Sequence, residues 1–203
     1  MNISKRSPFL VIAYYTIGDR YETLSENLKR SCQDFNIDIF TKGINTKGSW
    51  EKNTHYKANF ILECLETFSQ DLLYVDVDAL FRGYPDLFEN IDCDISYRTE
   101  NFSWRKNEAL SGTIYFKNNK KINNFVKKWI ELNNSCPANR MIPETWEQKN
   151  MQRALDLFSD IKYYNLPPGY TYIVDHSRRL YPNEKIIIEH FQESRHQFKN
   201  KGI

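Results

Sequence analysis

Residues 72–81, with the sequence Leu-Leu-Tyr-Val-Asp-Val-Asp-Ala-Leu-Phe, constrain the fold more than any other part of the chain. Residues 72–75 are typical of a strand that is buried on both faces, as in a parallel α/β sheet. Asp76 and Asp78 then interrupt the apolar run before it resumes. Residues two apart on an extended strand share a face, so we expect both carboxylates to point the same way and Val77 to turn aside.

This acidic pair predicts a cation site. Two carboxylates so close together repel by about 1 kcal/mol in water, and more strongly where the dielectric is low. A hard divalent cation, Mg²⁺ or Mn²⁺, is the simplest positive partner, and such ions commonly neutralise phosphate oxygens. Ligand sites also form beyond the carboxyl ends of parallel strands. An acidic pair of this kind can equally cap a loop or face solvent, but the apolar residues on both sides favour the metal.

The whole chain is compatible with one domain over residues 1–203. Its length and its hydrophobic content of 40% allow a sizeable core. The net charge of +2 is too small to imply nucleic-acid binding by itself. No apolar run approaches the roughly 18–20 residues of a membrane span, and we expect no signal peptide. Four scattered cysteines without a Cys-x-x-Cys pair favour reduced thiols and a cytoplasmic location, with peripheral contact at a membrane surface left open.

Strand and helix patterns alternate along the chain. This alternation predicts a single three-layer α/β/α domain of Rossmann-like type with a mostly parallel central sheet. The expected strands are residues 9–15, 37–41, 72–75, 94–98, 112–116, 161–164 and 186–188, and the expected helices are residues 19–32, 56–68, 122–130 and 151–158. Residues 42–53 are expected to form a loop.

Five features occur in an order that is similar to one enzyme class. They are Lys57 at the start of an expected helix, the Asp76 and Asp78 pair, the strand entry Ser111-Gly112, the pair Glu147-Gln148, and the late His190. Together they resemble the GT-A class of nucleotide-sugar glycosyltransferases, most closely the retaining branch with glycogenin-like and galactosyltransferase-like enzymes. That class has an Asp-x-Asp metal motif, an Asn/Ser-Gly-apolar strand and an acidic-Gln pair. The likeness runs from about residue 9 to residue 198.

The resemblance implies a divalent cation that bridges the donor diphosphate to the protein. Asp78 would bind Mn²⁺ or Mg²⁺ directly, and Asp76 would reach the ribose or reach the metal through water. His190 would supply a neutral imidazole nitrogen, a suitable ligand for Mn²⁺. A surface histidine is the alternative, although its position after an apolar segment favours a ligand.

The resemblance also implies catalytic and donor-binding residues. Lys57 and Arg195 would stabilise the charge that builds on the departing phosphate. Gln148 would lie near the β-face of the sugar, and Glu147 would bind a hydroxyl of the sugar or acceptor. Ser111 and Gly112 would belong to the donor site. Lys57 could equally be a solvated residue in the first turn of its helix.

The nucleotide base is expected near Tyr15, Thr16 and Tyr21, which follow the first strand. Here the chain departs from the class, because Tyr15-Thr16 replaces the usual acidic residue that closes this strand. A second departure is the missing glycine after the final His-Phe. Ordinary packing is the alternative role for the tyrosines. Sugar faces could meet the indoles of Trp50, Trp104 and Trp146, at least one of which is expected to be ordinary packing.

Several functions remain open on the sequence. The first is transfer from a nucleoside-diphosphate sugar, most simply a UDP-sugar, to a glycan or polysaccharide precursor. A modified, hydroxylated DNA base is a second acceptor, because Arg178-Arg179 and the tail of residues 195–203 are basic. A nucleotidyltransferase is a third, although the seven glycines form no phosphate-binding loop. A fourth is a non-catalytic module that keeps the fold.

Overall fold

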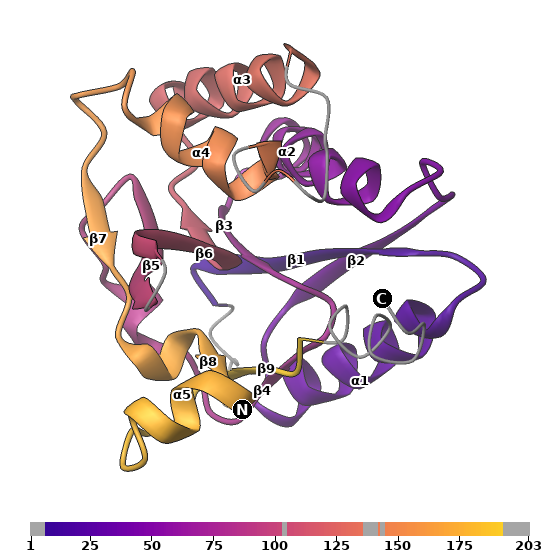
Figure 1. Cartoon of the computed structure of the whole chain (residues 1–203). Coiled ribbons are helices and arrows are strands. Elements are labelled where there is room, and N and C mark those ends of the chain that lie inside the picture. Colours follow the sequence, from indigo (N-terminus) through magenta and orange to yellow (C-terminus); the bar gives the residue numbers. More distant parts are fainter. Residues whose placement is uncertain (1–6, 103–104, 136–141, 143–144, 193–203) are drawn as a thin grey trace.

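The alternating strands and helices build a central six-stranded sheet with an accessory sheet of three strands. The computed structural model describes residues 7–102, 105–135, 142 and 145–192 (Figure 1). The strands are β1 (Phe9–Thr16), β2 (Ile39–Ile44), β3 (Asp71–Val75), β4 (Ala79–Phe81), β5 (Ile95–Phe102), β6 (Arg105–Phe116), β7 (Tyr163–Asn165), β8 (Tyr172–Ile173) and β9 (Ile188–His190). The helices are α1 (Arg20–Asp34), α2 (Trp50–Thr67), α3 (Lys120–Ser135), α4 (Glu147–Leu155) and α5 (Val174–Leu180), with short 3₁₀ turns at η1 (Asp86–Glu89) and η3 (Pro168–Tyr170).

The order of strands in the central sheet is β2-β1-β3-β6-β5-β7. β1 runs parallel to β2 and to β3, and β5 runs parallel to β7. β6 is antiparallel to both of its neighbours, β3 and β5. Parallel pairings therefore outnumber antiparallel ones, which confirms the mixed α/β fold with a mostly parallel sheet. The carboxyl ends of β1 and β3 lie at the same edge of this sheet.

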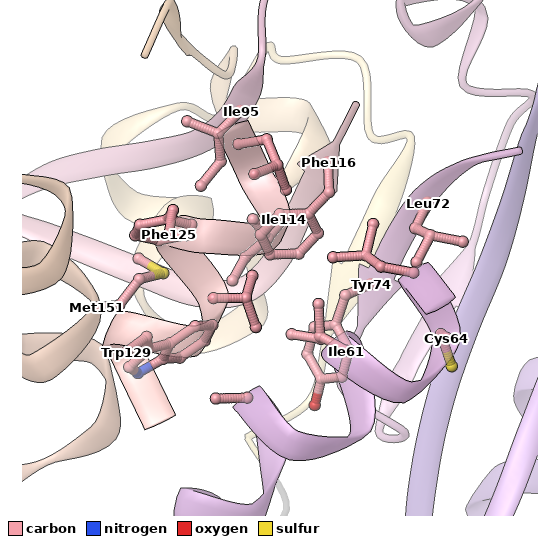
Figure 2. Packing of buried hydrophobic residues seen from close by; sticks show 14 of the residues in the cluster. Ile61, Cys64, Leu72, Tyr74, Ile95, Ile114, Phe116, Phe125, Trp129 and Met151 are labelled. Atoms are coloured by element: carbon pink, nitrogen blue, oxygen red, sulfur yellow. The ribbon is translucent and has the colours of Figure 1, made fainter. Parts of the chain in front are cut away.

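Helices cover both faces of the sheet. In Figure 1, α2, α3 and α4 lie on one face, and α1 lies on the other face together with the small sheet of order β4-β9-β8. The side chains of β3 alternate between these layers. Leu72 and Tyr74 belong to the core under α2, α3 and α4, where they pack with Ile114 and Phe116 (Figure 2). Leu73 and Val75 belong to the core on the opposite face of the sheet, so β3 is buried on both faces as predicted.

Two expected boundaries differ from the structure. α2 begins at Trp50, because the Ser49 side chain accepts a hydrogen bond from the backbone N–H of Lys52 and caps the helix there. Residues 50–53 are therefore helical, where a loop was expected. β2 continues through Gly43 to Ile44, because it stays paired with β1 along its full length.

The second half of the chain differs more. The strands expected at residues 94–98 and 112–116 are parts of the longer β5 and β6, which pair as an antiparallel hairpin. The last strand, β9, covers residues 188–190 where residues 186–188 were expected. The short β4 and the helix α5 were not expected. In the part of the chain that the structure describes, no helix combines the length and apolarity that a membrane crossing requires.

Candidate active site

A cleft of about 450 Å³ opens at the carboxyl ends of β1 and β3. Its lining includes every site residue expected from the sequence except Arg195, which lies outside the described residues. The expected residues that line it are Tyr15, Thr16, Tyr21, Lys57, Asp76, Asp78, Ser111, Gly112, Glu147, Gln148 and His190. Trp50 and Trp146 also line the cleft, whereas Trp104 lies outside the described residues. Residues that are far apart in sequence therefore share one cavity.

The acidic pair lies in a tight turn and not on a strand. β3 ends at Val75, and the backbone N–H of Ala79 donates to the carbonyl oxygen of Asp76 over 2.9 Å. The expectation that Asp76 and Asp78 share a strand face was therefore wrong, because this turn closes directly after the buried strand. The turn still directs both side chains to the cleft.

Short strand pairing places His190 beside this turn. β4 and β9 are antiparallel, with Ala79 opposite His190. The backbone N–H of Phe191 also reaches the carbonyl oxygen of Asp78 over 3.4 Å. The two segments are about a hundred residues apart in the chain, so only the accessory sheet brings them together. His190 is buried and is not a surface histidine.

One ligand atom from each of Asp76, Asp78 and His190 lies within 4.8 Å of the others. We call this group the metal corner. Two carboxylate oxygens and one imidazole nitrogen are a donor set that suits Mn²⁺ and is acceptable for Mg²⁺. Burial lowers the pKa of His190 to about 4, although the nearby carboxylate of Asp76 acts in the opposite direction. The imidazole is therefore neutral at physiological pH, and a ring nitrogen is available to a metal.

Tyr74 and Gly112 shape the metal corner. The hydroxyl of Tyr74 donates to Asp76 Oδ1 over 2.7 Å. Burial, followed by the charge of Asp76, raises the pKa of Tyr74 well above its usual value, so this donor keeps its proton. A Cβ at Gly112 would lie 3.1 Å from His190 Cε1 and 3.3 Å from Asp76 Oδ2. A larger residue would press on both expected ligands.

A second charged group lines the cleft directly beside the metal corner. Lys57 Nζ donates to Glu147 Oε1 over 2.9 Å and to the Ser111 hydroxyl over 3.1 Å. The Ser111 hydroxyl also donates to Glu147 Oε1 over 2.6 Å. We call these three residues the lysine corner. Lys57 Nζ lies 3.2 Å from Asp76 Oδ1, so the two corners touch.

Lys57 is buried, and the solvated alternative for it was wrong. Because α2 begins at Trp50, Lys57 lies well inside the helix and not in its first turn. Burial by itself lowers the pKa of an ammonium group, but the carboxylates of Asp76 and Glu147 outweigh that effect and raise the pKa of Lys57. The side chain therefore stays charged. Glu147 Oε2 is also buried, and it has no hydrogen-bond partner in the described part of the chain.

Gln148 is held by Glu108, a residue that the sequence reasoning missed. Gln148 Nε2 donates to Glu108 Oε1, and Lys149 Nζ lies 2.6 Å from Glu108 Oε2. Glu108 is almost fully buried on β6 and lines the cleft. Because the amide nitrogen of Gln148 points to Glu108, its carbonyl oxygen points elsewhere. No local sequence pattern marked Glu108, because a carboxylate on a strand has no distinctive spacing.

The end of the cleft where the sequence predicts a nucleotide base follows β1. Tyr15, Thr16 and Tyr21 line it as expected. The hydroxyl of Thr16 donates to Asp19 Oδ2 over 2.6 Å, and Asp19 Oδ1 accepts from the backbone N–H of Tyr21, which caps α1. The start of α1 is thereby held against the end of β1. Burial, followed by the charge of Asp78, raises the pKa of Tyr21, so its hydroxyl is neutral.

Comparison with known proteins identifies the fold. No protein-family model matches the sequence, and no curated protein is detectably similar to it. Solved structures of glycosyltransferases do share the fold. A glycosyltransferase involved in the glycosylation of the major capsid of PBCV-1 has a TM-score of 0.69 at 14% identity, over 91% of this chain and 92% of that chain.

Two further solved structures have the same architecture. The glycosyltransferase GlyE of Streptococcus pneumoniae TIGR4 has a TM-score of 0.61 at 15% identity, over 92% of this chain and 55% of that chain. The galactosyltransferase LgtC, solved with donor and acceptor sugar analogues, has a TM-score of 0.52 at 10% identity, over 90% of this chain and 87% of that chain. The chain therefore has the GT-A type of α/β fold that was expected from its sequence. Its structural neighbours are glycosyltransferases.

Proposed function

We propose that this protein is a metal-dependent glycosyltransferase that moves a sugar from a nucleoside-diphosphate sugar to a hydroxyl acceptor. The observation that carries the proposal is the convergence of Asp76, Asp78 and His190 within 4.8 Å at the floor of a 450 Å³ cleft. A fold shared with glycosyltransferases supports the same reaction class. A UDP-sugar is the first choice of donor.

The metal corner would hold Mn²⁺ or Mg²⁺. When bound, the ion supplies the positive charge that a diphosphate leaving group needs. We propose that Asp78 is a direct ligand, that Asp76 is a ligand through water or binds the ribose, and that His190 completes the set. Tyr15, Thr16 and Tyr21 would contact the base. Tyr15 and Thr16 lie at the end of β1 and Tyr21 lies in the first turn of α1. All three line the cleft together with the acidic turn, which supports this orientation.

The lysine corner would position the donor sugar and its phosphate. Lys57 carries a permanent positive charge next to Asp76. Gly112 follows Ser111 of the lysine corner and lies against Asp76 and His190 of the metal corner. Arg195 remains a proposed second phosphate contact. Gln148 would present its carbonyl oxygen to the sugar, because its amide nitrogen donates to Glu108. Glu147 would accept from a sugar hydroxyl. We propose that the configuration at the anomeric carbon is retained, as in the branch that the sequence resembles.

The acceptor is proposed to be a glycan or polysaccharide precursor. Trp50 and Trp146 support this choice, because both line the cleft and an indole readily stacks on a sugar face. The basic tail that suggested a modified DNA base lies outside the described residues. We also propose a reducing, cytoplasmic location. The described cysteines, Cys32, Cys64 and Cys93, are buried free thiols that support it.

A donor panel tests the proposal. The protein is mixed with UDP- and GDP-sugars, with Mn²⁺ or with EDTA, and melting temperature and nucleoside-diphosphate release are measured. We expect one donor to stabilise the fold and to be hydrolysed slowly, in both cases only with the metal. Release of pyrophosphate from a nucleoside triphosphate and sugar phosphate would instead indicate a nucleotidyltransferase. No stabilisation and no release with any donor would reject the proposal. Salt-dependent binding of duplex DNA would favour the DNA acceptor.

A further inference from the structure

Thr113 makes a buried contact with the histidine of the metal corner. Its hydroxyl oxygen lies 2.7 Å from His190 Nε2. Thr113 is fully buried and His190 is 2% exposed, so water does not compete for this hydrogen bond. Thr113 lies on β6, directly opposite Val75 at the end of β3. The contact therefore joins the central sheet to the accessory sheet that carries His190.

The contact leaves one ring nitrogen for a metal. A neutral imidazole has one N–H donor and one acceptor nitrogen, and a metal binds only at the acceptor. Because Nε2 is engaged by Thr113, the available nitrogen is Nδ1. The position of a Cβ on Gly112 would lie 3.2 Å from His190 Nδ1 and 3.3 Å from Asp76 Oδ2. The Nδ1 edge of the ring therefore faces the same point as the carboxylate of Asp76.

We infer that Thr113 is a positioning residue, which accepts the Nε2–H of His190 so that Nδ1 binds the divalent cation. The inference rests on the proposed function, because it takes the metal corner to be occupied by an ion. A partner that fixes the tautomer and orientation of a metal-binding histidine usually contributes strongly to metal affinity.

Metal affinity provides the first test. Binding of Mn²⁺ to the full chain is measured by calorimetry, or by the spin resonance of the free ion, for the wild type, Thr113→Val and Thr113→Ser. Valine keeps the shape of threonine and removes the hydroxyl, whereas serine keeps the hydroxyl. We expect Mn²⁺ affinity to fall by about 10- to 100-fold in Thr113→Val and to stay within about threefold of the wild type in Thr113→Ser. Melting temperatures in EDTA verify that the variants fold.

The tautomer provides a second test that needs no variant at Thr113. Long-range ¹H–¹⁵N spectra of histidine-labelled protein distinguish an Nε2–H ring from an Nδ1–H ring. The chain has 4 histidines, and His190→Gln identifies the signal of His190. We expect the Nε2–H form without metal and a change at Nδ1 when Mg²⁺ is added. An Nδ1–H ring, or a change at Nε2, would overturn the inference.

The outcomes separate this inference from the proposed function. Undiminished Mn²⁺ affinity in a folded Thr113→Val protein would refute the role of Thr113 and leave the metal site in place. A wild-type protein that binds neither Mn²⁺ nor Mg²⁺ would remove the metal from the proposed function, and this inference with it.

Discussion

The two charged corners of the cleft floor are built in opposite ways. In the lysine corner the side chains of Lys57 and Glu147 are 4% and 8% exposed, and their charges face each other. In the metal corner the side chain of Asp76 is 40% exposed, and its neighbour Asp78 is also only partly buried. A buried charge must be paired because its desolvation is costly, whereas a site for an exchangeable ion must stay open to solvent. The difference agrees with the proposal that the lysine corner is permanent structure, whereas the metal corner takes up a divalent cation.

The largest expected effect is on sugar transfer and comes from a substitution in the metal corner. Asp78→Asn removes a ligand charge, and we expect sugar transfer to fall by at least about 1,000-fold, equivalent to about 4 kcal/mol of transition-state stabilisation. Stabilisation by Mn²⁺ should disappear while the melting temperature in EDTA stays near the wild-type value. Asp38→Asn, at an exposed residue before β2, is the matched control and should leave both properties unchanged. Full activity in Asp78→Asn would eliminate a catalytic metal at this corner.

Substitutions in the lysine corner should mainly change the free energy of unfolding. Lys57→Met leaves the buried carboxylate of Glu147 without its cation, so we expect the free energy of unfolding to fall by about 3 kcal/mol. The double variant Lys57→Met/Glu147→Gln should recover part of this loss, because the unpaired charge is then gone. Urea denaturation measures both. Lys52→Met, at an exposed position of the same helix, is the control. An unchanged free energy of unfolding in Lys57→Met would show that Glu147 does not depend on Lys57 for the pairing of its charge.

A pH experiment sharpens the contrast at His190. The folded pKa is lowered to about 4 by burial, and the unfolded value is about 6.5. Below pH 6.5 the unfolded chain takes up a proton that the folded protein excludes, so stability is full above pH 6.5 and is lost as the pH falls toward 4. From pH 7 to pH 5 this contribution should be about 2 kcal/mol. Urea denaturation in EDTA measures this effect. Between pH 7 and pH 5 the free energy of unfolding of the wild type should fall by about 2 kcal/mol more than that of His190→Gln. Equal losses would contradict the buried neutral imidazole.

The smallest expected effect is at the residue that orients Gln148. Glu108→Leu removes the acceptor for the Gln148 amide, and we expect kcat to fall by about tenfold, the value of one hydrogen bond of about 1 to 1.5 kcal/mol. Glu108→Gln keeps an oxygen acceptor and should be affected less. Neither variant should change Mn²⁺ affinity, because Glu108 is not part of the metal corner. Initial rates at saturating donor measure the effect, and equal rates in all three proteins would remove this role of Glu108.

The sequence predicted the elements whose pattern is local. The strand of residues 72–75 is recognisable because it is buried on both faces, and Leu72 and Leu73 do belong to opposite cores. The helix after Asp19 was recognisable from its apolar spacing, and the structure adds its cap. The start of α2 was missed because polar residues of a first helical turn resemble a loop until the Ser49 cap is seen.

Within the candidate site, the sequence indicated which residues take part but not which of them contact one another. Asp76, Asp78, Lys57 and His190 were recognisable through the resemblance and the acidic break in an apolar strand. Glu108 and Thr113 were not, because a carboxylate or hydroxyl on a strand has no distinctive spacing. Their partners, Gln148 and His190, lie tens of residues further along the chain. Such pairs depend on the register of β6 against its neighbours.

The sequence by itself determined which residues are buried in β3, where the acidic turn interrupts that strand, and therefore that the fold is a layered α/β structure. These properties depend on side chains a few residues apart. The tertiary structure alone decided that His190 stands beside Asp78, that Lys57 is sealed against Glu147, and that Thr113 engages one nitrogen of the histidine ring. Those contacts join segments separated by about 80 to 110 residues, and only the packing of the two sheets and of α2 against α4 sets their distances.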